Sequence, residues 1–214
     1  MVDENSAAKA PGLIIHWPAR YDLLVWLLTL GGERAFRKKL VALAQLAPGE
    51  AILDVGCGTG TLAIAARRQV GPRGMVSGID ASPEMIARAE RKARKAGAEV
   101  AFKIGSAQNL PFPDAQFDAV TLTVMLHHLS RKGRGECARE VRRVLKPGGR
   151  ALVVDFGGPT RKTKGILAHL HRHGHVAPGD LTTLLIDAGL SIVEKGSVGL
   201  SDLHYVLAVT PEGP

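Results

Sequence analysis

Three glycines at alternating positions follow a short apolar segment and form the clearest chemical signal in the chain. Residues 53–60 read Leu-Asp-Val-Gly-Cys-Gly-Thr-Gly, which places the glycines at Gly56, Gly58 and Gly60. Glycine tolerates positive φ angles and lets a ligand approach the backbone closely. The free N–H groups of the helix that should follow favour anionic or polar ligand groups. This loop therefore predicts a site for a nucleotide-like ligand.

Two aspartates complete the predicted site. Asp80 ends the next apolar segment about twenty residues after the loop, where a carboxylate can accept hydrogen bonds from both hydroxyls of a ribose. Asp54 precedes the first glycine by two residues, where its charge would oppose a pyrophosphate but would suit a positively charged group. The spacing also differs from the Gly-x-Gly-x-x-Gly of dinucleotide sites. These features favour an adenosine-containing cofactor with a positive charge, such as S-adenosylmethionine, and leave nicotinamide chemistry as the alternative.

Predicted strands and helices alternate along the chain, which is typical of an α/β fold with a doubly wound, Rossmann-like and mostly parallel sheet. Parallel strands would bring the glycine loop and Asp80 to one edge of that sheet. The last two strands have too short a connection for a crossover helix, so they should pair as an antiparallel hairpin. The seven expected strands are 51–55, 75–80, 99–104, 117–123, 150–155, 191–198 and 204–210; the expected helices are 21–30, 33–47, 61–70, 83–97, 133–145 and 179–188.

The length of 214 residues fits a single domain with one core. Within it we expect an N-terminal arm with cap helices over residues 1–47 and a cofactor-binding core over residues 48–156. Residues 157–178 do not follow the strand–helix rhythm and should form an insertion on the substrate side. Residues 179–210 should form a C-terminal helix and the hairpin.

The formal net charge of +8 raises the question of a nucleic-acid partner. The basic residues recur at helical spacing over 88–95 and 139–146, which is typical of solvated helix faces. We therefore do not expect nucleic acid to be the partner, although a basic protein can favour anionic substrates or contact a membrane surface.

Other features of the composition bear on location and redox chemistry. No apolar run reaches the roughly eighteen residues of a membrane-spanning helix, and the chain begins with acidic residues where a signal peptide would be basic. These observations predict a cytoplasmic protein without a transmembrane segment. Cys57 and Cys137 are far apart in sequence, so neither a disulfide framework nor a cysteine-based zinc site is expected.

Four motifs in order resemble those of class I S-adenosylmethionine-dependent methyltransferases. They are the glycine loop at 53–60, Gly-Ile-Asp-Ala-Ser-Pro-Glu-Met at 78–85, Asn-Leu-Pro-Phe-Pro-Asp with Phe-Asp at 109–118, and Arg-Val-Leu-Lys-Pro-Gly-Gly at 143–149. The similarity extends from Leu40 to Val209. The subgroup most similar to this chain contains small-molecule enzymes that resemble ubiquinone/menaquinone-biosynthesis C-methyltransferases.

The resemblance implies which residues contact the cofactor, whose product form is S-adenosylhomocysteine. The glycine loop would hold the methionine part, Asp80 the ribose and residues 105–107 the edge of the adenine. The family often has Gly-Asp-Ala at 105–107, whereas this chain has Gly-Ser-Ala, so the adenine would be held more weakly unless Gln108 compensates. The implied contact residues are Asp54, Gly56, Cys57, Gly58, Gly60, Asp80, Ala81, Ser106, Ala107 and Thr123.

Methyl transfer is an in-line displacement from an activated sulfonium, so the protein mainly supplies alignment and adds a base only where the acceptor must lose a proton. His127 and His128 follow the fourth expected strand at the functional edge and are the candidate catalytic bases. Their alternative interpretation is structural, with the rings filling or capping the start of a helix.

The acceptor is less well defined by the residues. Nucleic-acid amino methyltransferases of this class carry an Asn/Asp-Pro-Pro-Tyr/Phe tetrad after the fourth strand, where this chain has Thr-Val-Met-Leu-His at 123–127. The apolar residues favour a small, partly apolar acceptor, although they could equally complete a core strand. A regulatory protein that binds S-adenosylmethionine without turnover is the non-enzymatic alternative.

Four histidines at every second position lie in the predicted insertion, and His171, His173 and His175 belong to this run. With Tyr21, they are the candidates for contact with the acceptor, although a polar surface loop is the other interpretation. No acidic residue or cysteine accompanies the run closely, so we expect no metal site there.

Overall fold

The computed structural model describes residues 32–157, 176–199 and 202–212. The helix expected at 21–30, most of the N-terminal arm and most of the insertion lie outside these residues. The elements in chain order are α2 (Glu33–Leu43), β1 (Ala51–Val55), α3 (Thr61–Val70), β2 (Met75–Asp80), α4 (Pro83–Ala96), β3 (Ala101–Ile104), β4 (Phe117–Thr123), the 3-10 turn η1 (Leu126–His128), α5 (Arg131–Val144), β5 (Leu145–Phe156), α7 (Pro178–Asp187), β6 (Ser191–Ser197) and β7 (Leu203–Val209).

The described strands form one seven-stranded sheet in the order β3-β2-β1-β4-β5-β7-β6. Neighbouring strands from β3 to β5 pair in parallel, whereas β7 pairs antiparallel with both β5 and β6. The prediction of a Rossmann-like, mostly parallel sheet with a terminal hairpin is confirmed. The strand order reverses between β1 and β4, so the carboxyl ends of these two strands form the crevice in which such sheets bind ligands.

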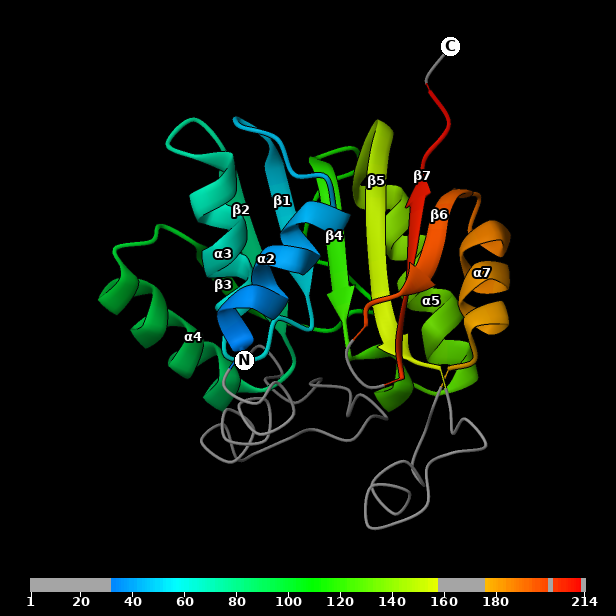
Figure 1. Cartoon of the computed structure of the whole chain (residues 1–214), viewed down its shortest axis with the longest axis horizontal. Coiled ribbons are helices and arrows are strands. Elements are labelled where there is room, and N and C mark those ends of the chain that lie inside the picture. Colours follow the sequence, from blue (N-terminus) through cyan, green and yellow to red (C-terminus); the bar gives the residue numbers. More distant parts are fainter. Residues whose placement is uncertain (1–31, 158–175, 200–201, 213–214) are drawn as a thin grey trace, which may run out of the picture.

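Helices cover both faces of the sheet (Figure 1), and the alternation of side chains along each strand explains how. On β1, Ile52 packs in a buried cluster with residues of α2 and α3. Its neighbour Leu53 packs on the opposite face with residues of α5 and α7. Parallel strands buried on both faces require this near-continuous apolar sequence. None of the helices in the described ranges is long and apolar enough to cross a membrane.

Several predicted boundaries were wrong, among them one helix end, one helix start and one strand start. The helix expected over 33–47 ends at Leu43, and Gln45 then adopts a positive φ of 52°. The helix expected from residue 133 begins at Arg131, because the Ser130 hydroxyl caps it by accepting the Gly133 N–H at 3.1 Å. The strand expected from residue 150 begins at Leu145, which pairs with the first residue of β4 ahead of a register irregularity.

One arginine fixes the connection between α2 and β1, and so positions α2 against the sheet. The Arg150 guanidinium on β5 makes two hydrogen bonds of 2.8 and 2.6 Å to the Glu50 carboxylate. It also donates to the carbonyls of Ala44 and Gln45 at 2.7 and 2.6 Å, which satisfies acceptors just beyond the end of the helix. The orientation of α2 relative to the carboxyl edge therefore depends on a paired, largely buried side chain.

Two of the sequence motifs serve the scaffold. Arg143 donates to the carbonyls of Leu110 and Phe112 at 3.0 and 2.8 Å, and so holds the loop that precedes β4. The Asp118 carboxylate accepts the N–H of Ala51 at 2.8 Å and ties the starts of β4 and β1 together. Both contacts lie away from the carboxyl edge, so we assign them to the framework that supports the site.

Candidate functional site

The glycine loop leaves β1 in a conformation that few other residues adopt. The φ angles of Gly56, Gly58 and Gly60 are 68°, 53° and 76°, all in the left-handed region. The N–H groups of Gly56 and Cys57 both donate to the carbonyl of Ile79, at 2.8 and 3.0 Å. The backbone of the loop is therefore anchored to β2.

Two of these glycines are also required by close packing. A Cβ atom on Gly56 would lie 2.9 Å from the Cβ of Met125. A Cβ atom on Gly60 would lie 2.8 Å from the side chains of Ala89 on α4 and Phe102 on β3. Real Cβ contacts are longer than this, so substitution at either position requires the surroundings to move.

Asp80 joins the end of β2 to the loop. One of its carboxylate oxygens accepts the N–H of Gly58 and the other accepts the N–H of Ser82, both at 2.9 Å. Partial burial raises the pKa of Asp80, and these backbone hydrogen bonds oppose the rise. Each carboxylate oxygen keeps lone pairs for a further donor. The exposed residue Ala81 follows directly, at the outer end of the strand.

Asp54 is an acid buried between strands. It lies beside Thr121 in the parallel pair of β1 and β4, and the Thr121 hydroxyl donates to its carboxylate at 2.7 Å. Burial raises the pKa of Asp54 to about 6, and the nearby charge of Asp80 adds to the rise. The Thr121 hydrogen bond and the positive charge of Arg37 oppose it. A positively charged ligand group placed near Asp54 would therefore stabilise the ionised form of its carboxyl group.

Arg37 of α2 faces Asp54 across a narrow cavity. The Arg37 side chain is 11% exposed, and its Nε is buried without a hydrogen-bond partner among the described residues. The Thr123 hydroxyl oxygen on β4 is likewise buried and has no hydrogen-bond partner in the described part of the chain. Unsatisfied buried polar groups are rare, so two in one cavity indicate a site for a polar ligand. The cavity is lined by Arg37, Asp54, Gly56, Cys57, Thr59, Thr61, Leu62 and Thr123.

Arg37 is a site residue that our sequence analysis did not identify. Helical periodicity offered a signal, because Arg37 precedes Leu40 and Val41 by three and four residues, and these are the buried residues of α2. A basic residue on the buried face of an amphipathic helix needs a partner inside the protein.

Ser106 and Ala107 follow β3 at the same edge as Asp80. The N–H of Gly105 donates to the Asp80 carbonyl at 3.0 Å, which places this turn beside the end of β2. The Ser106 hydroxyl donates to the side-chain oxygen of Gln108 at 2.7 Å and accepts the Gln108 N–H at 3.2 Å. Gln108 is therefore close enough to supplement Ser106, while their contact with adenine stays a prediction.

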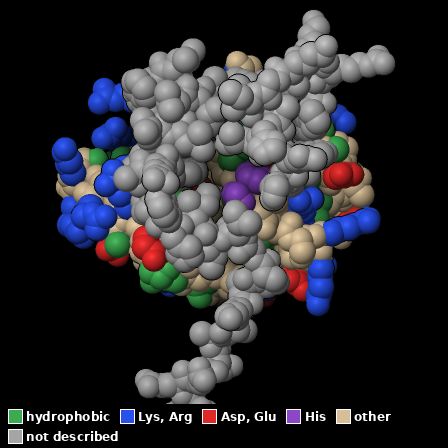
Figure 2. Space-filling view, turned by 90° about the horizontal axis from the view of Figure 1, so that it is seen from below, with side chains coloured by type: hydrophobic (Ala, Val, Ile, Leu, Met, Phe, Trp, Pro, Cys, Tyr) green, Lys and Arg blue, Asp and Glu red, His purple; other side chains and the backbone are tan. Residues whose placement is uncertain are grey.

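A histidine–aspartate pair lies at the carboxyl ends of β4 and β5. The His127 Nδ1 lies 2.8 Å from one carboxylate oxygen of Asp155, whose side chain is fully buried. The same aspartate accepts the backbone N–H of His127 at 3.2 Å and that of Phe156 at 2.8 Å. Figure 2 looks onto this edge and shows histidine side chains near its middle.

His128 has a different environment from its neighbour. Its ring centroid lies 3.9 Å from that of His127. Burial lowers the pKa of His128 to about 4, and the neighbouring His127 contributes to the same shift. The His128 ring is therefore neutral at physiological pH. The two candidate bases that were equivalent in sequence are thus distinguished by their surroundings.

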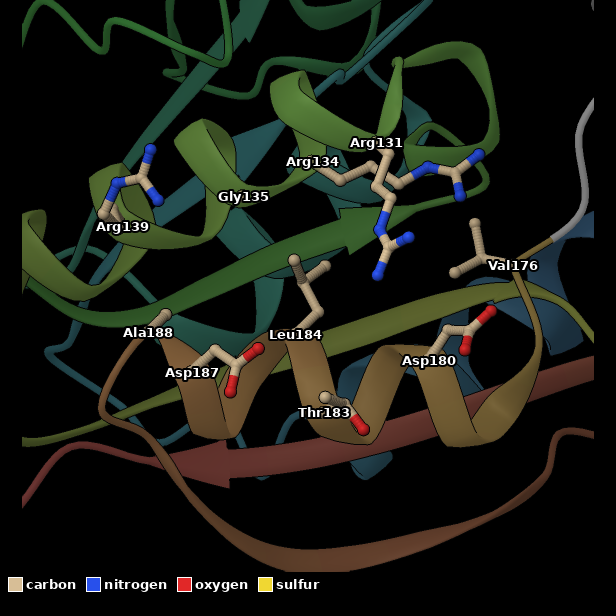
Figure 3. Close-up of a pocket in the computed structure, with 10 residues that line it drawn as sticks. All are labelled: Arg131, Arg134, Gly135, Arg139, Val176, Asp180, Thr183, Leu184, Asp187 and Ala188. Carbon is tan, nitrogen blue, oxygen red and sulfur yellow. The ribbon is translucent and has the colours of Figure 1, made fainter.

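A second cavity, of about 430 Å³, lies between α5 and α7. Figure 3 shows Arg131 and Arg134 on the α5 wall and Asp180 and Asp187 on the α7 wall. The glycine loop and Asp80 do not line this cavity. Its walls carry charges of both signs, so it is unsuited to an apolar acceptor.

Several predicted site residues lie outside the described part of the chain: Tyr21, His171, His173 and His175. Their contacts with an acceptor stay predictions. Among the residues that the structure describes, no group of three or more His, Cys, Asp or Glu side chains could hold a metal ion. The histidine run at 169–175 lies outside these residues.

Comparison with known proteins agrees with this geometry. A family model described as a methyltransferase domain matches residues 52–149. A demethylmenaquinone methyltransferase from Thermus thermophilus is 39% identical over 154 residues, which are 71% of this chain and 68% of the relative. The chain belongs to the class I S-adenosylmethionine-dependent methyltransferases. The predicted fold, enzyme class and cofactor are thereby confirmed, and the nicotinamide alternative is set aside.

Two further relatives of this methyltransferase support the assignment. The ubiquinone/menaquinone biosynthesis C-methyltransferase UbiE of Pseudomonas entomophila is 37% identical over 164 residues. That alignment covers 75% of this chain but only 63% of UbiE. The crystal structure of a SAM-dependent methyltransferase from Aquifex aeolicus is 25% identical with a TM-score of 0.72, over 90% of this chain and 97% of the other.

The close packing around the glycine loop predicts how a substitution there changes the stability of the protein. Gly60→Ala should reduce the free energy of unfolding by about 2–4 kcal/mol, because the new methyl overlaps Ala89 and Phe102 at a left-handed position. The matched control is Gly97→Ala, which has a similar φ of 60° and no atom within 4 Å of its Cβ. It should lose only about 1 kcal/mol. Equal losses in urea denaturation would contradict the role assigned to packing at Gly60.

Proposed function

We propose that the protein transfers the methyl group of S-adenosylmethionine to a ring position of a small, quinone-type acceptor in its reduced form. The observation that supports the donor half is the cavity between Arg37 and Asp54, where two buried polar atoms lack hydrogen-bond partners among the residues that the structure describes. The acceptor half is supported by two relatives, one named for demethylmenaquinone and the other for ubiquinone and menaquinone biosynthesis.

The methionine end of the cofactor fits the cavity by charge. The guanidinium of Arg37 would bind the carboxylate, because an arginine can donate several hydrogen bonds to such a group. The Asp54 carboxylate would face the ammonium group. Gly56, Cys57, Gly58 and Gly60 would supply backbone contacts, and the Thr123 hydroxyl would gain a partner. This zwitterion matches both buried charges, whereas a ligand of one charge would match only one.

The adenosine end would lie along the ends of β2 and β3. The Asp80 carboxylate would bind the ribose hydroxyls with lone pairs not used by Gly58 and Ser82. Ala81 is small and exposed, so an adenine ring could lie against it. Ser106 and Ala107 would contact the edge of that ring, with Gln108 beside them.

When bound, S-adenosylmethionine supplies a methyl group on a positively charged sulfur. The chain supplies orientation and a site shielded from water. His127 is our candidate for the proton acceptor, whereas His128 would contribute to the catalytic site by packing against the His127 ring. An acceptor ring would lie over the ends of β4 and β5, where Met125 and Phe156 offer apolar surface.

A quinone-type acceptor bears on where the protein would act in the cell. Quinones with isoprenoid tails partition into membranes, and a protein with a net charge of +8 is attracted to anionic lipid surfaces. We therefore propose a cytoplasmic enzyme that contacts a membrane peripherally to reach its acceptor. Tyr21 and the histidines of the insertion are proposed to contact the acceptor.

Thermal unfolding with added ligands tests the cofactor site. S-adenosylhomocysteine at about one hundred times its Kd should add about 2.7 kcal/mol of stability, which raises Tm by about 5–10 °C. NADH should have no effect. Asp80→Ala should abolish the shift, whereas Asp187→Ala, which removes an exposed carboxylate of α7, should retain it. Stabilisation by NADH alone would refute the proposal.

A methyl-transfer assay tests the acceptor separately. Radiolabelled S-adenosylmethionine and a short-chain demethylmenaquinone, kept reduced, should yield the methylated ring. If S-adenosylhomocysteine binds but no label is transferred, the acceptor proposal is wrong and the cofactor assignment stands.

The raised pKa of Asp54 predicts how binding depends on pH. Thr121, Arg37 and Asp80 face this carboxylate. A ligand ammonium favours its ionised form, so protonation near pH 6 opposes binding. The affinity for S-adenosylhomocysteine should fall about tenfold between pH 7.5 and pH 5. Titration calorimetry of wild type and Asp54→Asn checks this: the variant should bind weakly with a much flatter profile. Stronger binding of the wild type at pH 5 would contradict the assignment.

A further inference from the structure

Asp155 is a fully buried carboxylate at the carboxyl edge that none of the cofactor contacts uses. We propose that Asp155 is a positioning residue that holds His127 with its Nδ1 protonated, so that Nε2 accepts a proton from the methyl acceptor. This inference rests on the proposed methyl transfer. It adds a residue that our sequence analysis did not select and specifies which nitrogen of His127 acts.

The hydrogen bonds of Asp155 determine the tautomer of His127. One oxygen accepts the Phe156 N–H at 2.8 Å and the other accepts the His127 N–H at 3.2 Å. An ionised carboxylate has no proton to donate, so it can only accept a hydrogen bond from the imidazole. The Nδ1 atom of His127, 2.8 Å away, must therefore carry the proton. The lone pair of the neutral ring is then on Nε2, which points away from Asp155.

Packing fixes the orientation of the His127 ring. The ring is 11% exposed and contacts Phe156 edge-on, with centroids 5.5 Å apart. The centroid of the His128 ring lies 3.9 Å from that of His127, with the two planes tilted by 45°. His204 is opposite Asp155 in the pairing of β5 and β7, but no hydrogen bond joins these two side chains among the described residues. The carboxylate is therefore directed to His127.

His128 does not have the features of this pair. Its side chain makes no hydrogen bond within the described part of the chain, and burial opposes its protonation. A base must be stabilised after it takes up a proton, and of the two rings His127 is the one that is hydrogen-bonded to the buried carboxylate of Asp155. Of the two candidate bases, the geometry points to His127.

The position of the pair suits proton removal during methyl transfer. His127 follows four residues after Thr123, which lines the cavity proposed for the methionine end. Nε2 would accept a hydroxyl proton from the acceptor, and the O–H electron pair would stay on oxygen. A ring carbon would then bond to the methyl carbon as the methyl–sulfur bond breaks, with that pair kept by sulfur. The ring proton leaves and the hydroxyl is reprotonated, so one proton is released overall.

Nuclear magnetic resonance of ¹⁵N-histidine-labelled protein tests the tautomer directly and needs no acceptor. The chain has eight histidines, and comparison with His127→Gln identifies the signals of His127. At neutral pH, Nδ1 should carry a hydrogen-bonded proton and Nε2 should show the shift of an unprotonated nitrogen. In Asp155→Asn, the amide cannot accept all three donors, so the proton should move to Nε2. A wild-type spectrum with Nε2 protonated would overturn the proposal.

Turnover with the reduced short-chain demethylmenaquinone tests the chemical consequence. His127→Gln and Asp155→Asn should each lower kcat by about 100-fold or more, while the Kd for S-adenosylhomocysteine stays within about twofold of wild type. Asp187→Asn is the control for loss of a carboxylate away from the edge. Unchanged kcat in both variants would overturn the proposal, whereas failure of wild type to bind S-adenosylhomocysteine would refute the proposed function instead. If this quinol is not a substrate, the spectrum alone decides.

Discussion

The parallel pairing of β1 with β4 is the constraint on which the rest of the site depends. Its register places Asp54 beside Thr121, on the face of the sheet covered by α2 and α3. A shift of one residue would turn Asp54 to the opposite face and separate it from Arg37. The same pairing brings the glycine loop and Thr123 to one crevice. The cavity is therefore a consequence of strand register as much as of loop sequence.

Two buried aspartates, Asp54 and Asp155, lie on opposite faces of the sheet and have different proposed roles. Asp54 faces the α2 side, where Arg37 and Thr121 offset part of the cost of burying its charge. Asp155 follows Val154 on β5 and faces the other side, where donors surround its carboxylate. Both lie near the carboxyl ends of strands that flank β4, and the alternation of side chains along each strand places the two carboxylates on opposite faces of the sheet.

The glycine loop and Asp80 could be predicted from the sequence because their spacing reports local geometry: a turn after a strand and a carboxylate after the next strand. Arg37 and Asp155 were missed, because each acts through a partner distant in sequence. Nothing in the sequence distinguishes His127 from His128, and the fold shows that His127 is the one hydrogen-bonded to Asp155. The hairpin was predicted, but the insertion of β7 between β5 and β6 depends on pairing that no local pattern specifies.

A crystal structure of the protein with S-adenosylhomocysteine would show directly how the cavity is used. We expect the ligand carboxylate within hydrogen-bonding distance of the Arg37 guanidinium, the ammonium group facing Asp54 and the ribose hydroxyls on Asp80. A ligand bound at the carboxyl edge with its carboxylate directed away from Arg37, or bound between α5 and α7, would contradict the assignment of the Arg37–Asp54 cavity to the methionine end.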